Sequence, residues 1–325
     1  MKLAFIIDPI GGLDPTHDTS VALMEAACQM GYGVFITTMA DLAIRDGKCW
    51  GRLTPVQIEP VVLVEGKWRA PQPWYHLDRA QWQPLEAMDG VWMRPDPPVT
   101  TQYLYATYLL DYIDPHKTLV LNSPKGIRAA NEKLYTLRFL SVMPKTIVTT
   151  DKEMIFDFVQ EEGRAVMKPL GGKGGEGILF LEPKDQNLNS MIEISTDRGK
   201  TPVMVQTFLP QAKDGDKRII LLDGEPIGAV NRIPKSGEFR GNMAAGGSVA
   251  QTTITDREQE ICRLLAPQLK ADGLFFVGID VIGGYLTEVN VTSPTGIREI
   301  DRLHGLNLGK TVMEKLAQKL PVMEK

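Results

Sequence analysis

The chain has 325 residues, of which 43% are hydrophobic and 23% charged, and its formal net charge is −4. That length allows two or three domains with ample cores, and the composition is ordinary for a globular protein. The negative net charge argues against general nucleic-acid binding. The sequence has no apolar run of about 18 residues, so we expect no membrane span. The opening MKLAFIIDPIGG is interrupted too soon for a signal peptide.

The cysteines and histidines form no recognisable metal or redox motif. Cys28, Cys49 and Cys262 are scattered, without a C-x-x-C pair, and the four histidines lie far apart in the sequence. We interpret the cysteines as buried thiols in a reducing compartment and therefore expect a cytoplasmic protein. We assign the histidines no role.

The first part of the chain predicts an open α/β domain. Residues 3–8 should form a buried strand, residues 18–30 a helix and residues 32–38 a second strand. This strand–helix–strand order is typical of open α/β domains. The glycine pair Gly11-Gly12 fits either a plain turn or a loop that contacts substrate.

All five tryptophans fall between residues 50 and 92. They fit either a small satellite core under a strand-rich insertion or a subunit interface, where aromatic residues are enriched. A strand at 90–94 should follow and end at Arg94, which the next prolines hold in place. An arginine at such a position indicates carboxylate recognition, with a plain surface arginine as the alternative.

The first domain should close with one helix and one strand. Residues 103–112 predict a helix with Leu104, Tyr108 and Tyr112 toward the core, and residues 118–121 predict a strand. Ser123-Pro124 then starts another helix, with serine as N-cap and proline at its first position. We therefore divide the chain into residues 1–122, 123–209 and 210–325.

The middle of the chain carries a glycine cluster, GGKGGEG at 171–177. A helix from 131 to 139, a strand at 147–149, a helix at 152–162 and a strand at 164–168 should precede it. Gly172, Gly174 and Gly177 match G-x-G-x-x-G, but that dinucleotide motif requires a helix next. Residues 178–182 predict a strand instead, stopped by Pro183.

A strand, a glycine loop and a second strand make a β-hairpin flap, whose backbone N–H groups can close over phosphates. The G-K-[ST] sequence of a Walker A loop is missing. Lys168 directly precedes the loop, where a strand lysine can reach the α- and β-phosphates. The alternative is a mobile surface hairpin without a ligand.

The last third contains a predicted strand hairpin, GIDVIGGYLTEVNV. With a three-residue turn at 283–285, Ile282 faces Leu286, Asp280 faces Glu288 and Gly278 faces Asn290. A two-residue turn would put Asp280 and Glu288 on opposite faces. Carboxylates about 5 Å apart on a sheet require a cation between them, and oxygen ligands favour Mg²⁺. The alternative is an acidic pair on a solvated face.

Several further elements surround this hairpin. A strand at 202–209 places Gln206 where a chain often borders an adenine ring, and strands at 218–222 and 226–230 follow. Residues 232–249 are rich in glycine and carry Lys235, Arg240 and Asn242, so they form either a linker or a lid over an anionic substrate. Helices at 256–270 and 308–319 complete the prediction.

Taken together, these motifs resemble the ATP-grasp superfamily, and within it the bacterial-type glutathione synthetase family. The resemblance covers nearly the whole chain, and its motifs are MRPDPP at 93–98, NEKL at 131–134, KPLGGKGG at 168–175, KDGDKR at 213–218, RGNMAAGG at 240–247 and LTEVNVTSPTGIREI at 286–300. The family usually has aspartate where Gly171 stands, and residues 50–82 match weakly.

The resemblance implies an ATP-grasp fold preceded by an N-terminal open α/β domain. It implies an ATP-dependent carboxylate–amine ligase that joins γ-glutamylcysteine to glycine through an acyl phosphate, with Mg²⁺ or Mn²⁺, in a homo-oligomer that the family suggests is a tetramer. Such chemistry needs positioning and charge neutralisation more than a protein nucleophile.

The expected site residues fall into four groups. Asp280, Glu288 and Asn290 hold the metal. Nucleotide contacts come from Lys133, Lys168, Gly171, Gly172, Gly174, Gly175, Gln206, Thr207, Phe208, Leu209 and Asp216. Arg218, Arg232 and Arg298 act on the reacting groups and substrate carboxylates. Substrate contacts come from Asp18, Arg94, Ser293 and the lid residues Arg240 and Asn242.

Other functions are compatible with parts of this pattern. Another ATP-grasp ligase, such as a D-alanine–D-alanine ligase or a glutamate-adding ligase, would share the ATP half and differ at Arg94, the lid and Arg298. A regulatory protein of synapsin type would bind ATP without ligating. A Rossmann oxidoreductase is disfavoured by the strand predicted after Gly177.

Overall fold

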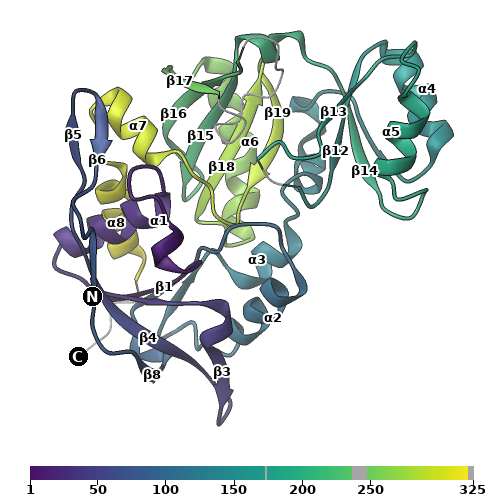
Figure 1. Cartoon of the computed structure of the whole chain (residues 1–325). Helices are drawn as coiled ribbons and strands as arrows, with labels where there is room; N and C mark the ends of the chain where they lie inside the picture. The colour runs from purple at the N-terminus through teal and green to yellow at the C-terminus, as the bar shows by residue number, and fades with distance from the viewer. Residues whose placement is uncertain (173, 236–246, 321–325) are drawn as a thin grey trace.

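The computed structural model describes residues 1–172, 174–235 and 247–320. It is a mixed α/β protein with three main sheets (Figure 1). Within the described ranges, no helix is both long and apolar enough to cross a membrane. The three cysteines are free thiols.

The N-terminal sheet is built around four parallel strands in the order β10-β9-β1-β2. These strands are β1 (Lys2–Ile6), β2 (Gly33–Thr37), β9 (Gly90–Met93) and β10 (Leu119–Leu121). Helix α1 (Thr19–Gln29) joins β1 to β2, and Asp18 caps it by accepting a hydrogen bond from the Val21 N–H. The predicted open α/β opening is therefore confirmed.

Residues 42–87 extend this sheet with antiparallel strands, as expected of a strand-rich insertion. The strands that extend the sheet are β3 (Leu42–Arg45), β4 (Lys48–Ile58), β7 (Tyr75–Leu77) and β8 (Gln81–Pro84), whereas β5 (Val62–Val64) and β6 (Lys67–Arg69) pair only with each other. The short 3₁₀ helices η1 (Ile10–Gly12) and η2 (Met39–Asp41) precede the insertion, and η3 (Leu85–Ala87) ends it. The tryptophans share no single environment, because Trp74 and Trp92 are buried in the main core whereas Trp82 is exposed.

Helix α2 (Thr101–Leu110) turns a different face inward from the one predicted. Tyr103, Ala106 and Leu110 are buried, whereas Tyr108 and Tyr112 are more than half exposed. The prediction was wrong because two stripes of this helix are apolar, and periodicity alone does not choose between them. Helix α3 (Pro124–Ala129) starts as predicted, with the Ser123 side chain as its cap.

The central sheet is antiparallel, in the order β11-β14-β12-β13, and projects at the upper right of Figure 1 with its two helices. Its elements are β11 (Thr146–Thr149), β12 (Ala165–Pro169), β13 (Leu179–Leu181), β14 (Val203–Thr207), α4 (Lys152–Glu162) and α5 (Leu188–Ser195). The strand predicted after the glycine loop is confirmed, and α5 was not predicted.

The segment before this sheet differs from the predicted α-helix. It is the 3₁₀ helix η4 (Leu134–Val142), which is broken at Phe139. Asn131 caps its start, since its Oδ1 accepts hydrogen bonds from the N–H groups of Lys133 and Leu134. Residues 131–133 precede this helix, and the Tyr135 N–H donates to the Asn131 carbonyl at 2.8 Å.

The third sheet is antiparallel, in the order β17-β16-β15-β18-β19. Its strands and helices are β15 (Asp216–Leu222), β16 (Glu225–Ile233), β17 (Ser248–Gln251), β18 (Phe276–Ile282), β19 (Tyr285–Asn290), η5 (Pro210–Asp214), α6 (Asp256–Ala271), α7 (Ile297–His304) and α8 (Leu308–Lys319). Helix α7 was not predicted from the sequence. Helix α8 has the predicted bounds.

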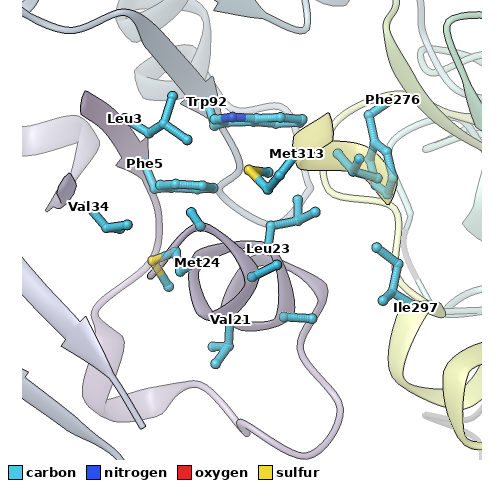
Figure 2. Close-up of a cluster of buried hydrophobic side chains, with 14 of the residues drawn as sticks. Leu3, Phe5, Val21, Leu23, Met24, Val34, Trp92, Phe276, Ile297 and Met313 are labelled. Atoms are coloured by element: carbon cyan, nitrogen blue, oxygen red, sulfur yellow. The ribbon is translucent and has the colours of Figure 1, made fainter. Parts of the chain in front are cut away.

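Helices α7 and α8 return to the N-terminal domain, where α8 lies beside α1 (Figure 1). Figure 2 shows the shared core, in which Met313 of α8 lies beside Phe5 and Trp92. The ring of Phe276 on β18 meets that of Trp92 with centroids 6.2 Å apart. The rings of Phe5 and Trp92 are parallel, with centroids 6.0 Å apart. Since this core joins both ends of the chain, it fixes the third sheet against the first.

The β18–β19 hairpin has the predicted facing pairs but a different turn. Asp280 pairs with Glu288 and Gly278 with Asn290, whereas Ile282 pairs with Tyr285. The turn therefore has two residues, Gly283 and Gly284, and not three. Val281 pairs with Leu286 and Asp280 with Glu288, so Thr287 is an extra residue on β19. This bulge restores the predicted pairing of Asp280 with Glu288.

Candidate active site

A cleft lies between the central sheet and the third sheet. The predicted residues that line it are Lys133, Lys168, Gly172, Gly174, Gly175, Gln206, Thr207, Phe208, Leu209, Asp216, Asp280 and Glu288. The lining also includes residues that sequence reasoning missed: Pro144, Val166, Glu176, Ile178, Ala212, Ile282 and Thr287.

One wall of the cleft comes from alternate residues of β12. Val166 and Lys168 are two apart, so both face the cleft. The Lys168 Nζ donates to Gln206 Oε1 on β14 at 2.7 Å, and Gln206 Nε2 donates to Thr146 Oγ1 at 3.0 Å. Burial lowers the pKa of Lys168, because desolvation disfavours its charged form.

Part of the cleft lining is apolar and includes Phe208. Val166, Ile178, Leu209 and Ile282 also line it. The Phe180 and Phe208 rings meet edge to face, with centroids 4.9 Å apart. A flat heteroaromatic base fits such a pocket, since its faces are apolar and its edge is polar. The sequence held a signal for two of these residues. Val166 is two positions from Lys168 and Ile282 is two positions from Asp280, so each shares a strand face with a predicted site residue.

A charged cluster adjoins the cleft: Asp216 and Asp280 line it, whereas the predicted residues Arg218, Arg232 and Asn290 are not among the lining residues. Arg218 makes two bonds to the Asp280 carboxylate, from Nε to Oδ1 at 2.5 Å and from its terminal nitrogen to Oδ2 at 3.0 Å. Arg232 lies between two carboxylates, at 2.5 Å from Asp216 Oδ2 and 2.9 Å from Asp280 Oδ2. All three elements, β15, β16 and β18, are neighbours in the sheet, which brings these side chains to one face.

These pairings separate the pKa values of the two aspartates. Burial opposes ionisation of Asp280, but Arg218 and Arg232 outweigh it and lower its pKa below the ordinary value. Burial raises the pKa of Asp216 to about 6, which Arg232 only partly offsets. Burial also opposes the charge of Arg232, but the two carboxylates raise its pKa. Asp280 is therefore the fixed negative charge of the cleft.

Glu288 and Asn290, on β19, lie beside Asp280 of the neighbouring strand β18. Lys133 Nζ donates to Glu288 Oε1 at 2.9 Å and to the Gly172 carbonyl at 2.9 Å. Asn290 Nδ2 lies 3.4 Å from Asp280 Oδ2. Within the described residues, no group of three His, Cys, Asp or Glu forms a metal site. Two carboxylates and an amide oxygen still fit a hard cation that takes its remaining ligands from water and phosphate.

The glycine loop shows why small residues stand there. A Cβ on Gly172 would lie 3.0 Å from the Glu176 carbonyl oxygen and from a side-chain carbon of Pro169. Gly174, Gly175 and Gly177 have positive φ angles, which favour glycine. Gly171 is exposed and lies outside the cleft lining.

Four predicted substrate residues lie toward the N-terminal domain. Buried Arg94 donates to Ser20 Oγ and to the Pro294 carbonyl, both at 3.0 Å, and Ser293 is buried beside that turn. Arg298 donates to Glu25 Oε2 at 2.6 Å and to the Pro15 carbonyl at 3.1 Å. Asp18 caps α1, and burial raises its pKa. None of these four is among the residues that line the described cleft.

The two lid residues Arg240 and Asn242 lie outside the described residues. The ends of the predicted lid segment are strands, since β16 runs to Ile233 and β17 starts at Ser248. These strands pair with each other, so the two ends of the segment lie side by side at the sheet edge.

Sequence reasoning also missed Asn131 and Glu132, which precede Lys133. Glu132 Oε1 accepts three hydrogen bonds, from the N–H groups of Val291 and Thr292 and from Thr292 Oγ1. Burial raises the pKa of Glu132, and the charge of Glu288 adds to that rise. The sequence signal for Asn131 and Glu132 was the NEKL motif, which does not indicate which residues they contact.

Several solved structures of similar fold are named as ATP-grasp ligases. D-cycloserine synthetase DcsG matches with a TM-score of 0.64 at 14% identity, covering 97% of this chain and 100% of that one. The ATP-grasp ligase PsnB complexed with minimal precursor matches with a TM-score of 0.62 at 18% identity, covering 97% and 98%. At these identities the likeness concerns the fold, and the fold is that of the ATP-grasp class.

Sequence comparisons identify the family within the ATP-grasp class. The prokaryotic glutathione synthetase N-terminal domain matches residues 1–128, and the prokaryotic glutathione synthetase ATP-grasp domain matches residues 132–305. The glutathione synthetase of Thermosynechococcus vestitus is 67% identical over 96% of this chain and 98% of that protein. The glutathione synthetase of Synechocystis sp. is 64% identical over the same shares. The chain belongs to the prokaryotic glutathione synthetase family, and it is an ATP-dependent ligase.

Proposed function

We propose that the protein joins γ-glutamylcysteine to glycine, with ATP, to give glutathione, ADP and phosphate through an acyl phosphate. Family membership over nearly the whole length supports the substrates. The observation that carries the chemistry is the cluster of Arg218, Arg232 and Asp280, in which Asp280 lines a cleft whose apolar residues suit an aromatic base.

A carboxylate is a poor acyl donor, so the reaction needs activation. Transfer of the γ-phosphoryl group to the cysteinyl carboxylate makes an acyl phosphate, which the amine of glycine attacks while phosphate leaves. This transfer depends on positioning and on neutralising charge in the transition state, not on a protein nucleophile. The site fits that need, since Lys133 and Lys168 line the cleft and Arg218 and Arg232 pair with its lining residue Asp280.

Nucleotide binding falls to residues from both sheets. Lys133 and Lys168 contact the phosphates, and the backbone at Gly171, Gly172, Gly174 and Gly175 covers them. The strand end at Gln206, Thr207, Phe208 and Leu209 borders the adenine, and Asp216 contacts the ribose. The burial of Lys168 supports a phosphate role, because an anion restores the charged state that desolvation disfavours.

Arg218 and Arg232 steady the transferred phosphoryl group and the oxyanion of the attacked carboxyl. Their pairing with Asp280 holds both guanidinium planes in place before substrate arrives, so little reorganisation is needed during the reaction. Arg298 binds a substrate carboxylate in this proposal. That role requires its present pair with Glu25 to be shared or opened.

The metal is Mg²⁺, with Mn²⁺ as the alternative, held by Asp280, Glu288 and Asn290. Members of the family use ATP, generally with a divalent metal. When bound, the ion neutralises phosphate charge. Since Lys133 and the two arginines already contact these carboxylates, nucleotide binding must rearrange some of the contacts.

The γ-glutamyl end of the peptide is assigned to the N-terminal side, at Arg94, Asp18 and Ser293. Arg94 is buried where it meets the Pro294 carbonyl of the third sheet's turn, which puts it at the junction of the domains. Arg240 and Asn242 belong to the lid in this proposal. A lid is needed because water would hydrolyse the acyl phosphate.

Release of ADP tests the reaction. The purified chain is given γ-glutamylcysteine and glycine together, each alone, and D-alanine alone. We expect ADP release only with both glutathione precursors. Equal release with D-alanine alone would favour a D-alanine ligase, and tight ATP binding without any release would favour a regulatory protein.

We expect a cytoplasmic homotetramer. The three free thiols support a reducing compartment, and the oligomer is an expectation from the family. Gel filtration with light scattering measures the mass, for which a monomer of 36.0 kDa is the unit.

A further inference from the structure

The tripeptide Asn131-Glu132-Lys133 lies between the glycine loop and β19 and bonds to both. We infer that Asn131 and Glu132 are positioning residues, which hold the glycine loop and the metal-binding end of β19 in register across the nucleotide cleft. This inference rests on the proposed metal–nucleotide site and extends it to two residues outside the predicted set.

Among the described residues, β19 is the edge strand of its sheet, so one of its sides has no strand partner there. N–H groups of alternate residues point to that side. The Val289 N–H donates to the Glu132 backbone carbonyl at 2.9 Å, and the Val291 N–H donates to Glu132 Oε1 at 2.9 Å. Glu132 thus satisfies two successive outward N–H groups, as a neighbouring strand would.

The same carboxylate oxygen continues past the strand end. It also accepts from the Thr292 N–H at 3.1 Å and from Thr292 Oγ1 at 2.9 Å. The bonds of Glu132 to Val289 and Val291 fix the backbone on both sides of Asn290, and the Val289 bond directly follows Glu288. Their side chains can then be aimed into the cleft without freedom for the strand to slide.

On its other side the tripeptide holds the glycine loop. Asn131 Nδ2 donates to the Leu170 carbonyl at 3.1 Å, and Lys133 Nζ donates to the Gly172 carbonyl at 2.9 Å. Because Asn131 Oδ1 also caps η4, the amide is fixed at both of its polar atoms. The glycine loop and β19 are therefore both held by the same short segment, residues 131–133.

Removing the Glu132 carboxylate should disturb the metal ligands more than the fold. In Glu132→Ala the Val291 and Thr292 N–H groups lose their acceptor, and the end of β19 can move. Glu132→Gln keeps a carbonyl oxygen that accepts the same N–H groups. A catalytic geometry is sensitive to displacements of about 0.5 Å, so a small movement of Glu288 and Asn290 is enough to weaken metal binding.

The experiment measures binding of Mg²⁺ and ADP by calorimetry over a Mg²⁺ series, and kcat in the full reaction. We expect Glu132→Ala to raise the half-maximal Mg²⁺ concentration about tenfold, roughly the effect of losing one or two hydrogen bonds. Glu132→Gln should stay within about threefold of the wild type. Thr292→Val removes only the hydroxyl bond and should shift the midpoint in the same direction by less.

Asp272→Ala is the matched control. Asp272 Oδ2 also accepts three hydrogen bonds, from Tyr135 Oη, Arg138 and Gln268, but outside the cleft lining. We expect it to lose thermal stability with an unchanged Mg²⁺ midpoint. A Glu132→Ala protein with lower stability and a normal midpoint, or an equal midpoint shift in Asp272→Ala, overturns the inference.

Asn131→Asp tests the link to the loop separately. It keeps the oxygen that caps η4 and loses the donor to the Leu170 carbonyl. We expect the KM for ATP to rise about tenfold with the Mg²⁺ midpoint nearly unchanged, and an unchanged KM contradicts the link. A wild type that binds no Mg²⁺–nucleotide refutes the site itself, whereas one that binds nucleotide without ligation refutes only the proposed reaction.

Discussion

Arg218 and Asp280 form a buried two-point ion pair between neighbouring strands, with Nε–Oδ1 and terminal nitrogen–Oδ2 distances of 2.5 and 3.0 Å. Their backbones are paired directly in the β15–β18 register. The pair therefore ties a proposed catalytic cation to a proposed metal ligand before any substrate binds.

We predict that Asp280→Asn loses both stability and ligation. The change leaves Arg218 without its charge partner in a buried position, which typically costs about 3–5 kcal/mol. Turnover should fall by at least about 100-fold, as expected for lost electrostatic preorganisation. Chemical denaturation and ADP release measure the two effects. Glu193→Gln is the control, because that carboxylate is exposed and pairs with Lys152 at the surface; wild-type turnover in Asp280→Asn contradicts the assignment.

Gly278 should tolerate no side chain. A Cβ there would lie 2.9 Å from the Pro294 Cβ and 3.1 Å from the Arg218 Cδ. We expect Gly278→Ala to cost about 1–3 kcal/mol through overpacking and to lower kcat by displacing Arg218. Gly12→Ala is its control, since nothing lies within 4 Å of a Cβ at that position. Equal kcat values for the two variants would show that Arg218 has room to adjust.

The pair of Arg298 and Glu25 separates a substrate role from a structural one. Both side chains are buried, and removal of either partner should destabilise the fold by about 3–5 kcal/mol. If Arg298 also binds a substrate carboxylate, Arg298→Gln should raise the KM of a substrate about tenfold or more, well beyond Glu25→Gln. Steady-state kinetics on both variants decide this, and matched KM values would leave Arg298 a structural residue.

Asp301 should give the stability a pH dependence. Burial raises its pKa from the ordinary 3.8 to about 7, against the opposing effects of the Leu308 N–H and of Arg298. Between pH 4 and 7 the native state then holds a proton that the unfolded state has released, so the free energy of unfolding falls as pH rises. At about 1.36 kcal/mol per pKa unit, the loss amounts to a few kcal/mol.

Asp301→Asn should remove this slope, because the amide does not titrate and its oxygen can still accept from the Leu308 N–H. Denaturation at pH 4, 5.5, 7 and 8 measures it. We expect the variant to gain stability relative to the wild type as pH rises from 4 to 7, with no further gain above. Identical slopes in the two proteins contradict the raised pKa.

Local spacing was enough to predict much of this protein. A lysine before a glycine loop, with a strand next, predicted the flap and Lys168, and the alternation in β18 and β19 predicted that Asp280 faces Glu288. These features depend on residues close in sequence, where backbone geometry fixes the direction of each side chain. The recognisable motifs predicted the ATP-grasp class and the glutathione synthetase family.

Contacts between distant residues were decided only by the tertiary structure. Arg218 and Arg232 both meet Asp280 because β15 lies between β16 and β18, and Arg298 meets Glu25 because α7 and α8 pack on α1. The inward face of α2, the bulge behind the two-residue turn and the bonds of Glu132 to β19 have the same origin. Each depends on which surface is opposite, and periodicity within one segment carries no information about that surface.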